Sequence, residues 1–318
     1  GFLGSTLARE LVNRGDRVLA IDAKLKSQQV PAFAGLAGNE NFVRLQADVS
    51  DRTLVRSLFR EFTPDRIFHL TAPRSEEPGE AFDADIACAF SVMDAARIEL
   101  ECREPEERKG FRMVNAIRRA NMPSPSGSST ESRSVSTRLR TDLIEKYAAA
   151  YDLHTVTCVA DSVFGRHDPR PTLINRLIQA LRDRNPFELV ETNVFRDWLP
   201  VADFATGMIA AAENGARGAA YEFSVGAERR DSDVAEIICA VLDRKRPLQG
   251  RAWIDLVTLA DARSARRQSP PSLDPGPAER DLKWRPRGFH AGIDSLIDWP
   301  ELRPASPPSP APVPHAAE

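Results

Sequence analysis

Short apolar runs alternate along the first half of the chain with segments in which apolar residues recur every three or four positions. The runs are short enough to be strands buried on both faces, and they cover residues 17–21, 42–45, 66–72, 111–116 and 155–160. The periodic segments predict amphipathic helices, and they cover residues 7–12, 54–62, 80–97 and 134–151. Strands that alternate with helices in this way predict a doubly wound parallel sheet, an α/β fold.

The pattern changes after Phe164-Gly165, where the chain becomes rich in proline and arginine. Helices are predicted there over residues 173–184, 202–213 and 233–242, and a strand over residues 221–225. We therefore expect a first domain over residues 1–163 and a smaller mixed lobe over residues 164–302, with elements partly interleaved. Residues 303–318 are rich in proline, alanine and serine and lack core-forming side chains, which predicts a disordered tail.

The first residues carry a pattern typical of dinucleotide binding. Gly1 and Gly4 directly precede a helix, and the strand that follows ends in Asp22. Such glycines let the backbone approach a pyrophosphate, whose charge the helix N-terminus stabilises, while the acid accepts hydrogen bonds from ribose hydroxyls. Glycines before a helix also occur in ordinary tight turns, so both interpretations stay open. The strand and glycine that open such a unit are absent, and we expect a truncated sequence, because losing a central strand would unpair its two neighbours.

Two further polar positions have competing interpretations. Asp48 follows the apolar run at residues 42–45, and it either contacts the adenine of a nucleotide or caps the next helix. His69 lies within an apolar run, which indicates a core histidine rather than a catalyst.

Composition narrows the range of partners. The net charge of −3 does not suggest a polyanion such as nucleic acid. Four cysteines are scattered without CxxC spacing, which indicates free thiols in a reducing compartment rather than a disulfide or metal framework. No apolar run approaches the roughly 20 residues of a membrane span. We expect a cytoplasmic protein without a metal site or a membrane partner.

Several segments, taken together, resemble the extended short-chain dehydrogenase/reductases, and within them the dTDP-glucose 4,6-dehydratases. The resemblance runs nearly end to end. It is carried by GFLGS at residues 1–5, ADVSDRTLV at 47–55, HLTA at 69–72, FRMV at 111–114, FRDWLPVADFATGM at 195–208 and AERDLKWRPR at 278–287. The resemblance implies a Rossmann-like first domain that holds NAD and a smaller lobe that holds a nucleotide sugar.

The resemblance also assigns binding positions. Arg196 matches an arginine that pairs with the nucleotide diphosphate; the alternative is an ion pair between Arg196 and Asp197. Trp198 is expected to pack in the core between the lobes. Asp22 favours NAD over NADP, because a carboxylate would repel a 2′-phosphate. The positions implied for the cofactor are Gly1, Phe2, Leu3, Gly4, Asp22, Asp48, Val49, Leu70 and Ala72.

The catalytic groups of the resembled family are replaced. In that family a Tyr of YxxxK removes the proton of the sugar 4-hydroxyl, and the Lys lowers its pKa. A Thr polarises C4, and an Asp-Glu pair carries out the elimination of water. No YxxxK exists in this chain, whose three tyrosines are followed at the fourth position by Tyr, Thr and Val. Counting without gaps, the five positions fall on Arg133, Thr137, Arg118, Arg119 and Ala120.

Three hypotheses of function follow from these replacements. The first is a pseudoenzyme that binds a nucleotide or a partner protein. The second is an NAD-dependent epimerase/dehydratase-type enzyme with rewired chemistry, in which Arg118, Arg119, Arg133 or His167 would act. The third, ranked last, is an intact dehydratase whose sequence is incomplete. Arg118 and Arg119 either bind an anion or form a solvated pair at a strand end.

A homodimer is the last expectation that the resemblance carries. The helices near residues 80–97 and 134–151 correspond to the pair that builds the family's dimeric four-helix bundle. Phe82, Phe90, Leu139 and Leu143 would supply an apolar seam. The alternative is that both helices bury these faces within their own domain.

Overall fold

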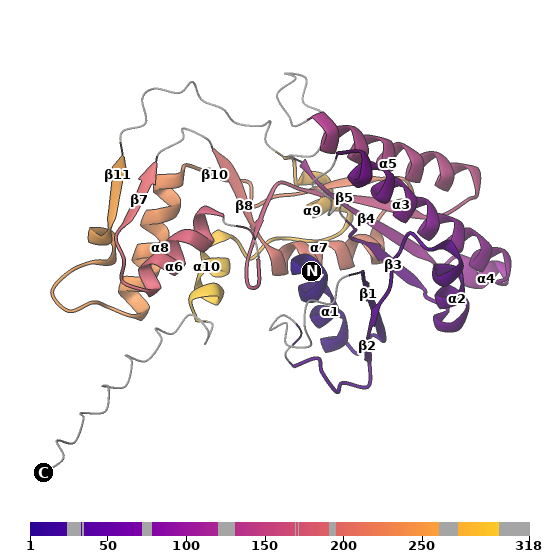
Figure 1. Cartoon of the computed structure of the whole chain (residues 1–318), viewed down its shortest axis with the longest axis horizontal. Coiled ribbons are helices and arrows are strands. Elements are labelled where there is room, and N and C mark those ends of the chain that lie inside the picture. The colour runs from indigo at the N-terminus through magenta and orange to yellow at the C-terminus, as the bar shows by residue number, and fades with distance from the viewer. Residues whose placement is uncertain are drawn as a thin grey trace, which may run out of the picture.

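The computed structural model shows two lobes (Figure 1). It describes residues 1–23, 33, 35–71, 78–119, 131–168, 170, 172–190, 195–260 and 273–298. The predicted tail at 303–318 and the positions Ala72 and Ala120 lie outside these residues. Of the helices in the described part, none is long and apolar enough to cross a membrane.

Parallel strands form the centre of the larger lobe, as predicted. A four-stranded sheet has the order β3-β4-β5-β9, and a separate pair joins β1 to β2; every neighbouring pair in both is parallel. Within the described residues, β1 and β3 each pair on one side only. The bounds are β1 Val18–Asp22, β2 Phe42–Gln46, β3 Arg66–His69, β4 Arg112–Arg118, β5 Thr155–Ala160 and β9 Ala220–Phe223.

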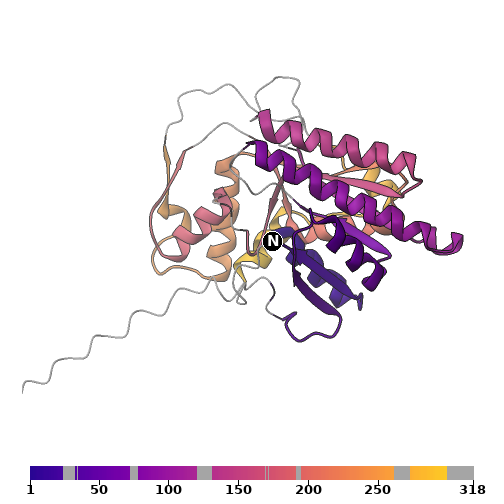
Figure 2. The ribbon, with the colours of Figure 1, turned by 45° about the vertical axis from the view of Figure 1, so that its right-hand side comes forward.

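Helices cover both faces of the four-stranded sheet, which confirms the α/β prediction. Alternate residues of β4 face opposite sides, so Val114 enters a core with α1 and α7, whereas Met113 enters a core with α2, α3 and α5. Figure 2 shows α3 and α5 lying side by side across the outer face. The bounds are α1 Phe2–Asn13, α2 Arg52–Phe62, α3 Pro78–Glu101, α4 Pro105–Arg108, α5 Glu131–Ala150 and α7 Val201–Asn214.

A glycine sets how closely α7 packs on the sheet. A Cβ at Gly207 would lie 2.4 Å from the ring of Phe223 on β9. Only glycine permits this approach, because a methyl group there would overlap the aromatic ring. The strand β8 (Arg196–Pro200) runs directly into α7 and contributes Leu199 to the same core as Val114 and Phe223.

The smaller lobe has its own core. Trp198 is 4% exposed and packs in this core with Phe164, at a ring-centroid distance of 6.3 Å. It therefore belongs to the smaller lobe itself, and the expected position between the lobes is corrected. Two sheets have the orders β10-β8-β6 and β11-β7. The elements are β6 Ser162–Phe164, α6 Leu173–Arg182, β7 Phe187–Val190, β8 Arg196–Pro200, β10 Glu228–Arg229, α8 Asp231–Lys245, η3 Trp253–Leu256, β11 Val257–Ala260 and α10 Phe289–Ile297.

The last part of the chain returns to the larger lobe. Helix α9 (Gly276–Asp281) contacts β9, and Trp284 packs in the core beneath α7. The Trp284 indole Nε1 donates to the Asp203 carbonyl oxygen at 3.1 Å. Elements on both sides of residue 164 thus contribute to the larger lobe.

Candidate functional site

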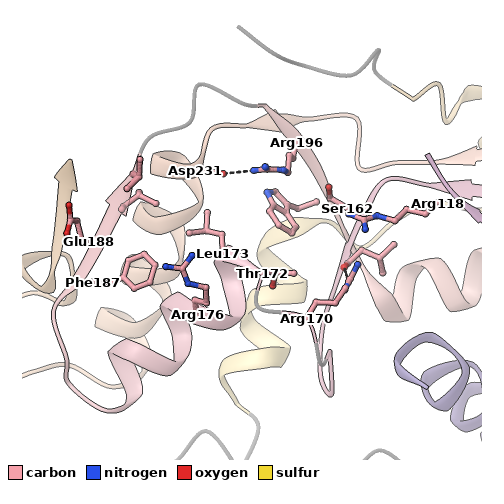
Figure 3. Close-up of a pocket in the computed structure, with 14 residues that line it drawn as sticks. Arg118, Ser162, Arg170, Thr172, Leu173, Arg176, Phe187, Glu188, Arg196 and Asp231 are labelled. Atoms are coloured by element: carbon pink, nitrogen blue, oxygen red, sulfur yellow. Dashed lines mark hydrogen bonds and ion pairs between the residues drawn. The ribbon is translucent and has the colours of Figure 1, made fainter. Parts of the chain in front are cut away.

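A cavity of about 380 Å³ opens where the carboxyl end of β4 meets the smaller lobe. In open α/β sheets this end of the strands is where ligands bind. Among the described residues, its charged lining consists of four arginines and two acids. They are Arg118, Arg170, Arg176, Arg196, Glu188 and Asp231 (Figure 3).

Arg170 is held rigidly at the cavity wall. Its Nε and Nη2 donate to the two carboxylate oxygens of Asp168 at 2.7 Å each, and the Asp168 side chain is fully buried. Nη2 also donates to the Val163 carbonyl oxygen. The guanidinium carbon lies 5.4 Å from the centre of the Phe2 ring, which links the cavity wall to the start of α1.

Arg196 is positioned by the first residue of α8. Its Nη1 donates to Asp231 Oδ1 at 3.0 Å, which leaves its other donors for a ligand. The predicted alternative, an ion pair with Asp197, is wrong because successive strand residues point to opposite faces. Asp197 instead accepts hydrogen bonds from Ser224 Oγ at 2.7 Å and from the Val225 and Ala227 amides.

Two arginines of the cavity have no carboxylate partner among the described residues. Arg176 lies over the ring of Phe187, with its guanidinium carbon 5.6 Å from the ring centre. Arg118 donates from Nε to the Asp161 carbonyl oxygen at 3.3 Å. Burial, followed by the charge of Arg170, lowers the pKa of Arg118 below its ordinary value, although Arg118 remains accessible. Arg118 therefore lies where an anion could bind, as one hypothesis proposed.

Arg119 does not share this position. Its guanidinium pairs with Glu222 on β9, and Glu222 also accepts a hydrogen bond from the Asp274 amide at 2.7 Å. The suggestion that Arg119 binds an anion beside Arg118 is therefore corrected, because its charge is already matched outside the cavity. Thr137 is 4% exposed within α5, and the side chain of Arg133 lies outside the described residues.

Most of the predicted cofactor positions lie close together. The Gly1 nitrogen is 3.3 Å from Asp22 Oδ2, and the Ala47 amide donates to the Asp22 carbonyl oxygen at 3.3 Å. A Cβ on Gly4 would lie 3.6 Å from Leu70 Cδ1. Leu3 packs partly buried in the core with α7. The start of α1, the end of β1 and the end of β3 therefore meet at one place.

Asp48 and Val49 behave differently from the other cofactor positions. Asp48 Oδ1 accepts hydrogen bonds from the amide and hydroxyl of Ser50 at 2.9 and 2.8 Å, which lowers its pKa. The residue that caps α2 is Asp51, whose Oδ1 accepts from the Thr53 and Leu54 amides. The prediction that Asp48 caps this helix is wrong. Val49 packs against the core beneath α2 and α3.

These positions fit the adenosine half of a dinucleotide. The Asp22 carboxylate at the end of β1 lies beside the N-terminus of α1, a twelve-residue helix. The carboxylate suits the ribose hydroxyls, and the helix N-terminus suits the pyrophosphate. The fit does not extend to the position implied for the catalytic lysine, because Thr137 is a buried residue without an ammonium group.

A buried charged pair lies beside these positions and was not predicted. Arg140 Nη1 on α5 donates to Asp85 Oδ1 on α3 at 2.8 Å and to the Thr71 carbonyl oxygen at 2.9 Å. His69, 3% exposed, contacts Thr71 Oγ1 at 2.7 Å. Burial and then the charge of Arg140 lower the pKa of His69 to about 3. The prediction of a core histidine is confirmed.

Comparison with known proteins identifies the family. Residues 1–226 match the NAD dependent epimerase/dehydratase family. The chain belongs to this family.

Individual members of the epimerase/dehydratase family match over most of their length. The dTDP-glucose 4,6-dehydratase of Xanthomonas campestris pv. campestris is 25% identical over 320 residues, which cover 94% of this chain and 90% of that protein. The dTDP-glucose 4,6-dehydratase 1 of Escherichia coli is 22% identical over 326 residues, which cover 94% of this chain and 90% of that protein. The resemblance to dTDP-glucose 4,6-dehydratases is thereby confirmed.

Solved structures of epimerase/dehydratase proteins share the fold. A dTDP-glucose 4,6-dehydratase from Bacillus anthracis, in complex with NAD, has a TM-score of 0.75 at 15% identity and covers 95% of this chain and 94% of its own. A UDP-glucose 4-epimerase from Thermotoga maritima, with UDP-glucose, has a TM-score of 0.72 at 16% identity and covers 93% and 94%. These matches confirm the Rossmann-like fold, and the family to which the chain belongs is NAD dependent, in agreement with the predicted cofactor.

Proposed function

We propose that this chain binds a nucleotide sugar in the arginine-lined cavity, next to an NAD site, and does not catalyse dehydration. The observation that carries the proposal is the group of arginines at the carboxyl end of β4. Guanidinium groups bind phosphates through paired N–H donors, which suits the diphosphate of a nucleotide sugar. Arg196, braced by Asp231, is the residue we assign to that diphosphate.

The NAD site of the proposal consists of the N-terminus of α1, Asp22 and the end of β3. Asp22 would accept hydrogen bonds from the adenosine ribose, and the helix N-terminus would stabilise the pyrophosphate. Two solved relatives support this assignment, since the Bacillus anthracis dehydratase and a Brucella ovis UDP-glucose 4-epimerase are both in complex with NAD. When bound, NAD would supply hydride acceptance; the chain's own residues would supply binding and orientation.

The loss of dehydratase chemistry is the second half of the proposal. Elimination of water requires an acid and a base near the sugar, whereas the positions that match the family's Asp-Glu pair hold Arg119 and Ala120, and the position that matches its lysine holds Thr137. Arg119 is already ion-paired with Glu222, and Thr137 is buried. Rewired enzymatic chemistry is less well supported. Of the described acids that line the cavity, Asp231 is ion-paired and Glu188 lies at the end away from Arg118 (Figure 3).

Apolar side chains on the outer face of α3 and α5 support a homodimer within the same proposal. Val135 and Leu139 are 49% and 43% exposed, and Phe82 and Phe90 are partly exposed. Large exposed side chains that follow one another along a helix are typical of an interface. A second copy of the chain would cover them.

Binding of UDP-glucose and dTDP-glucose, measured by isothermal titration calorimetry, tests the proposal. We expect micromolar affinity for at least one of them, and about a tenfold loss with Arg196→Met, since a charge-assisted hydrogen bond is worth about 1.5–3 kcal/mol. Arg217→Met is the control, because Arg217 pairs with Asp152 on the surface. Denatured protein should release NAD, detected by mass spectrometry. Formation of a 4-keto-6-deoxy sugar from dTDP-glucose would overturn the non-catalytic half.

A further inference from the structure

The charges of the cavity are balanced unevenly. Asp168 matches the charge of Arg170, and Asp231 matches that of Arg196. Arg118 lies in the same cavity, yet the hydrogen bond that it makes within the described residues goes to the neutral carbonyl oxygen of Asp161. Arg118 is exposed at the cavity wall, so its remaining guanidinium donors are open to an anion that enters the cavity.

The surroundings of Arg118 reinforce this imbalance. Burial, followed by the charge of Arg170 and more weakly that of Arg196, lowers the pKa of Arg118, whereas Asp161 and Asp168 act in the opposite direction. A ligand that places negative charge there would gain Coulomb energy from several arginines at once.

Arg118 also occupies a separate end of the cavity. Figure 3 shows Arg118 entering from β4 beside Ser162, whereas Arg176, Phe187 and Glu188 lie at the opposite end and Arg196 between them. A diphosphate held by Arg196 carries two groups, a nucleoside on one side and a hexose on the other. The end at Arg118 lies towards the proposed NAD site, because Arg170 beside it contacts Phe2 at the start of α1. We therefore place the hexose at Arg118 and the nucleoside at the other end, where Arg176 lies over Phe187.

We propose that the preferred ligand is a nucleotide sugar whose hexose carries a carboxylate, and that Arg118 binds this carboxylate. The inference rests on the proposed function, which it narrows to one class of nucleotide sugar. A guanidinium and a carboxylate form two parallel hydrogen bonds, so Arg118 would discriminate an acidic hexose from a neutral one. Arg118 is a binding residue in this proposal, and no chemical step is assigned to it.

Two matched ligand pairs test the inference: UDP-glucuronic acid against UDP-glucose, and dTDP-glucuronic acid against dTDP-glucose. Each pair differs only in the carboxylate on the hexose. In whichever pair the unaltered protein binds, we expect the acidic sugar to have about a tenfold lower Kd than the neutral sugar. This difference corresponds to about 1.4 kcal/mol in binding free energy. Arg118→Met should remove this difference and leave the affinity for the neutral sugar within about twofold.

Arg119→Met is the matched control, because Arg119 is adjacent in sequence but pairs with Glu222 outside the cavity. It should keep the preference for the acidic sugar. Equal affinities for both members of a pair would overturn the inference while leaving the proposed function intact. If Arg118→Met lowered the affinities for UDP, UDP-glucose and UDP-glucuronic acid equally, the inference would also be overturned, since Arg118 would then bind phosphate. No binding by any of the four sugars would overturn the proposed function itself. Circular dichroism verifies that each variant is folded.

Discussion

The buried pair between Asp85 and Arg140 offers the sharpest test of how the larger lobe is held together. The two side chains are 0% and 5% exposed. Arg140 also donates to the carbonyl oxygen of Thr71, just after β3, so its guanidinium connects α5 to both α3 and the end of β3. The perturbation we choose is Arg140→Met, which keeps a long side chain and removes the charge and every donor.

The expected destabilisation follows from what is left behind. Removing one partner of a buried pair typically costs about 3–5 kcal/mol, because the other charge stays buried and uncompensated. Asp85 can avoid this by taking up a proton. From the ordinary carboxyl pKa of 3.8, protonation at pH 7 costs about 4 kcal/mol. The lost hydrogen bond to Thr71 adds about 1 kcal/mol. We expect a loss of about 4–5 kcal/mol at pH 7.

The sign of the pH dependence follows from Asp85. Burial already raises its pKa in the intact protein, with Arg140 and Ser136 acting in the opposite direction. Without Arg140 the folded-state pKa rises further above the unfolded value. Stability linked to a raised pKa is fully present below the unfolded pKa and is lost as pH rises through the folded pKa. The penalty of Arg140→Met should therefore be smaller at pH 5 than at pH 7, by at most about 1.4 kcal/mol per pH unit.

Urea unfolding at pH 7 and pH 5, followed by circular dichroism, measures both quantities as a difference from the unaltered protein. Arg138→Met is the control for the loss of an arginine from α5, because Arg138 is exposed two residues away. The double variant Asp85→Asn with Arg140→Met should show no pH-dependent penalty, since no carboxyl remains. A penalty that is below 1 kcal/mol, or that is the same at both pH values, would refute the reasoning.

Three further predictions use other parts of the chain. Leu139→Glu should convert a dimer to a monomer in light scattering, and a monomeric mass for the unaltered protein at micromolar concentration would contradict the dimer. Asp51→Ala should lower the urea midpoint by an amount equivalent to about 1 kcal/mol through loss of the α2 cap, whereas Asp48→Ala, three residues earlier, should have a smaller effect. Asp22→Ala should reduce the NAD released on denaturation, and unchanged release would exclude Asp22 from the cofactor site.

The sheet was predictable from sequence because its strands are short apolar runs. All six residues of β5 are buried. A parallel strand that is buried on both faces appears in the sequence as a continuous apolar run, which differs from the periodic pattern of an amphipathic helix. Side-chain partners were much less predictable. Asp85 and Arg140 are 55 positions apart, and nothing in the sequence pattern of either helix indicates that the two side chains form a pair. Asp48 and Asp51 are both acids ahead of one helix, and only the backbone decides which of them caps it.

The two arginines at the end of β4 also have partners that the sequence does not predict, and this difference between them affects the functional assignment. Arg118 and Arg119 are identical in type and adjacent, so sequence alone treats them as one pair. The structure separates them, because β4 ends at Arg118 and the next residue reaches Glu222 on β9. One arginine therefore stabilises the sheet edge and the other adds positive charge to the cavity. A cavity that gains a cation at the end of β4 is suited to holding an anion in place, and this is why we assign binding rather than elimination to the cavity.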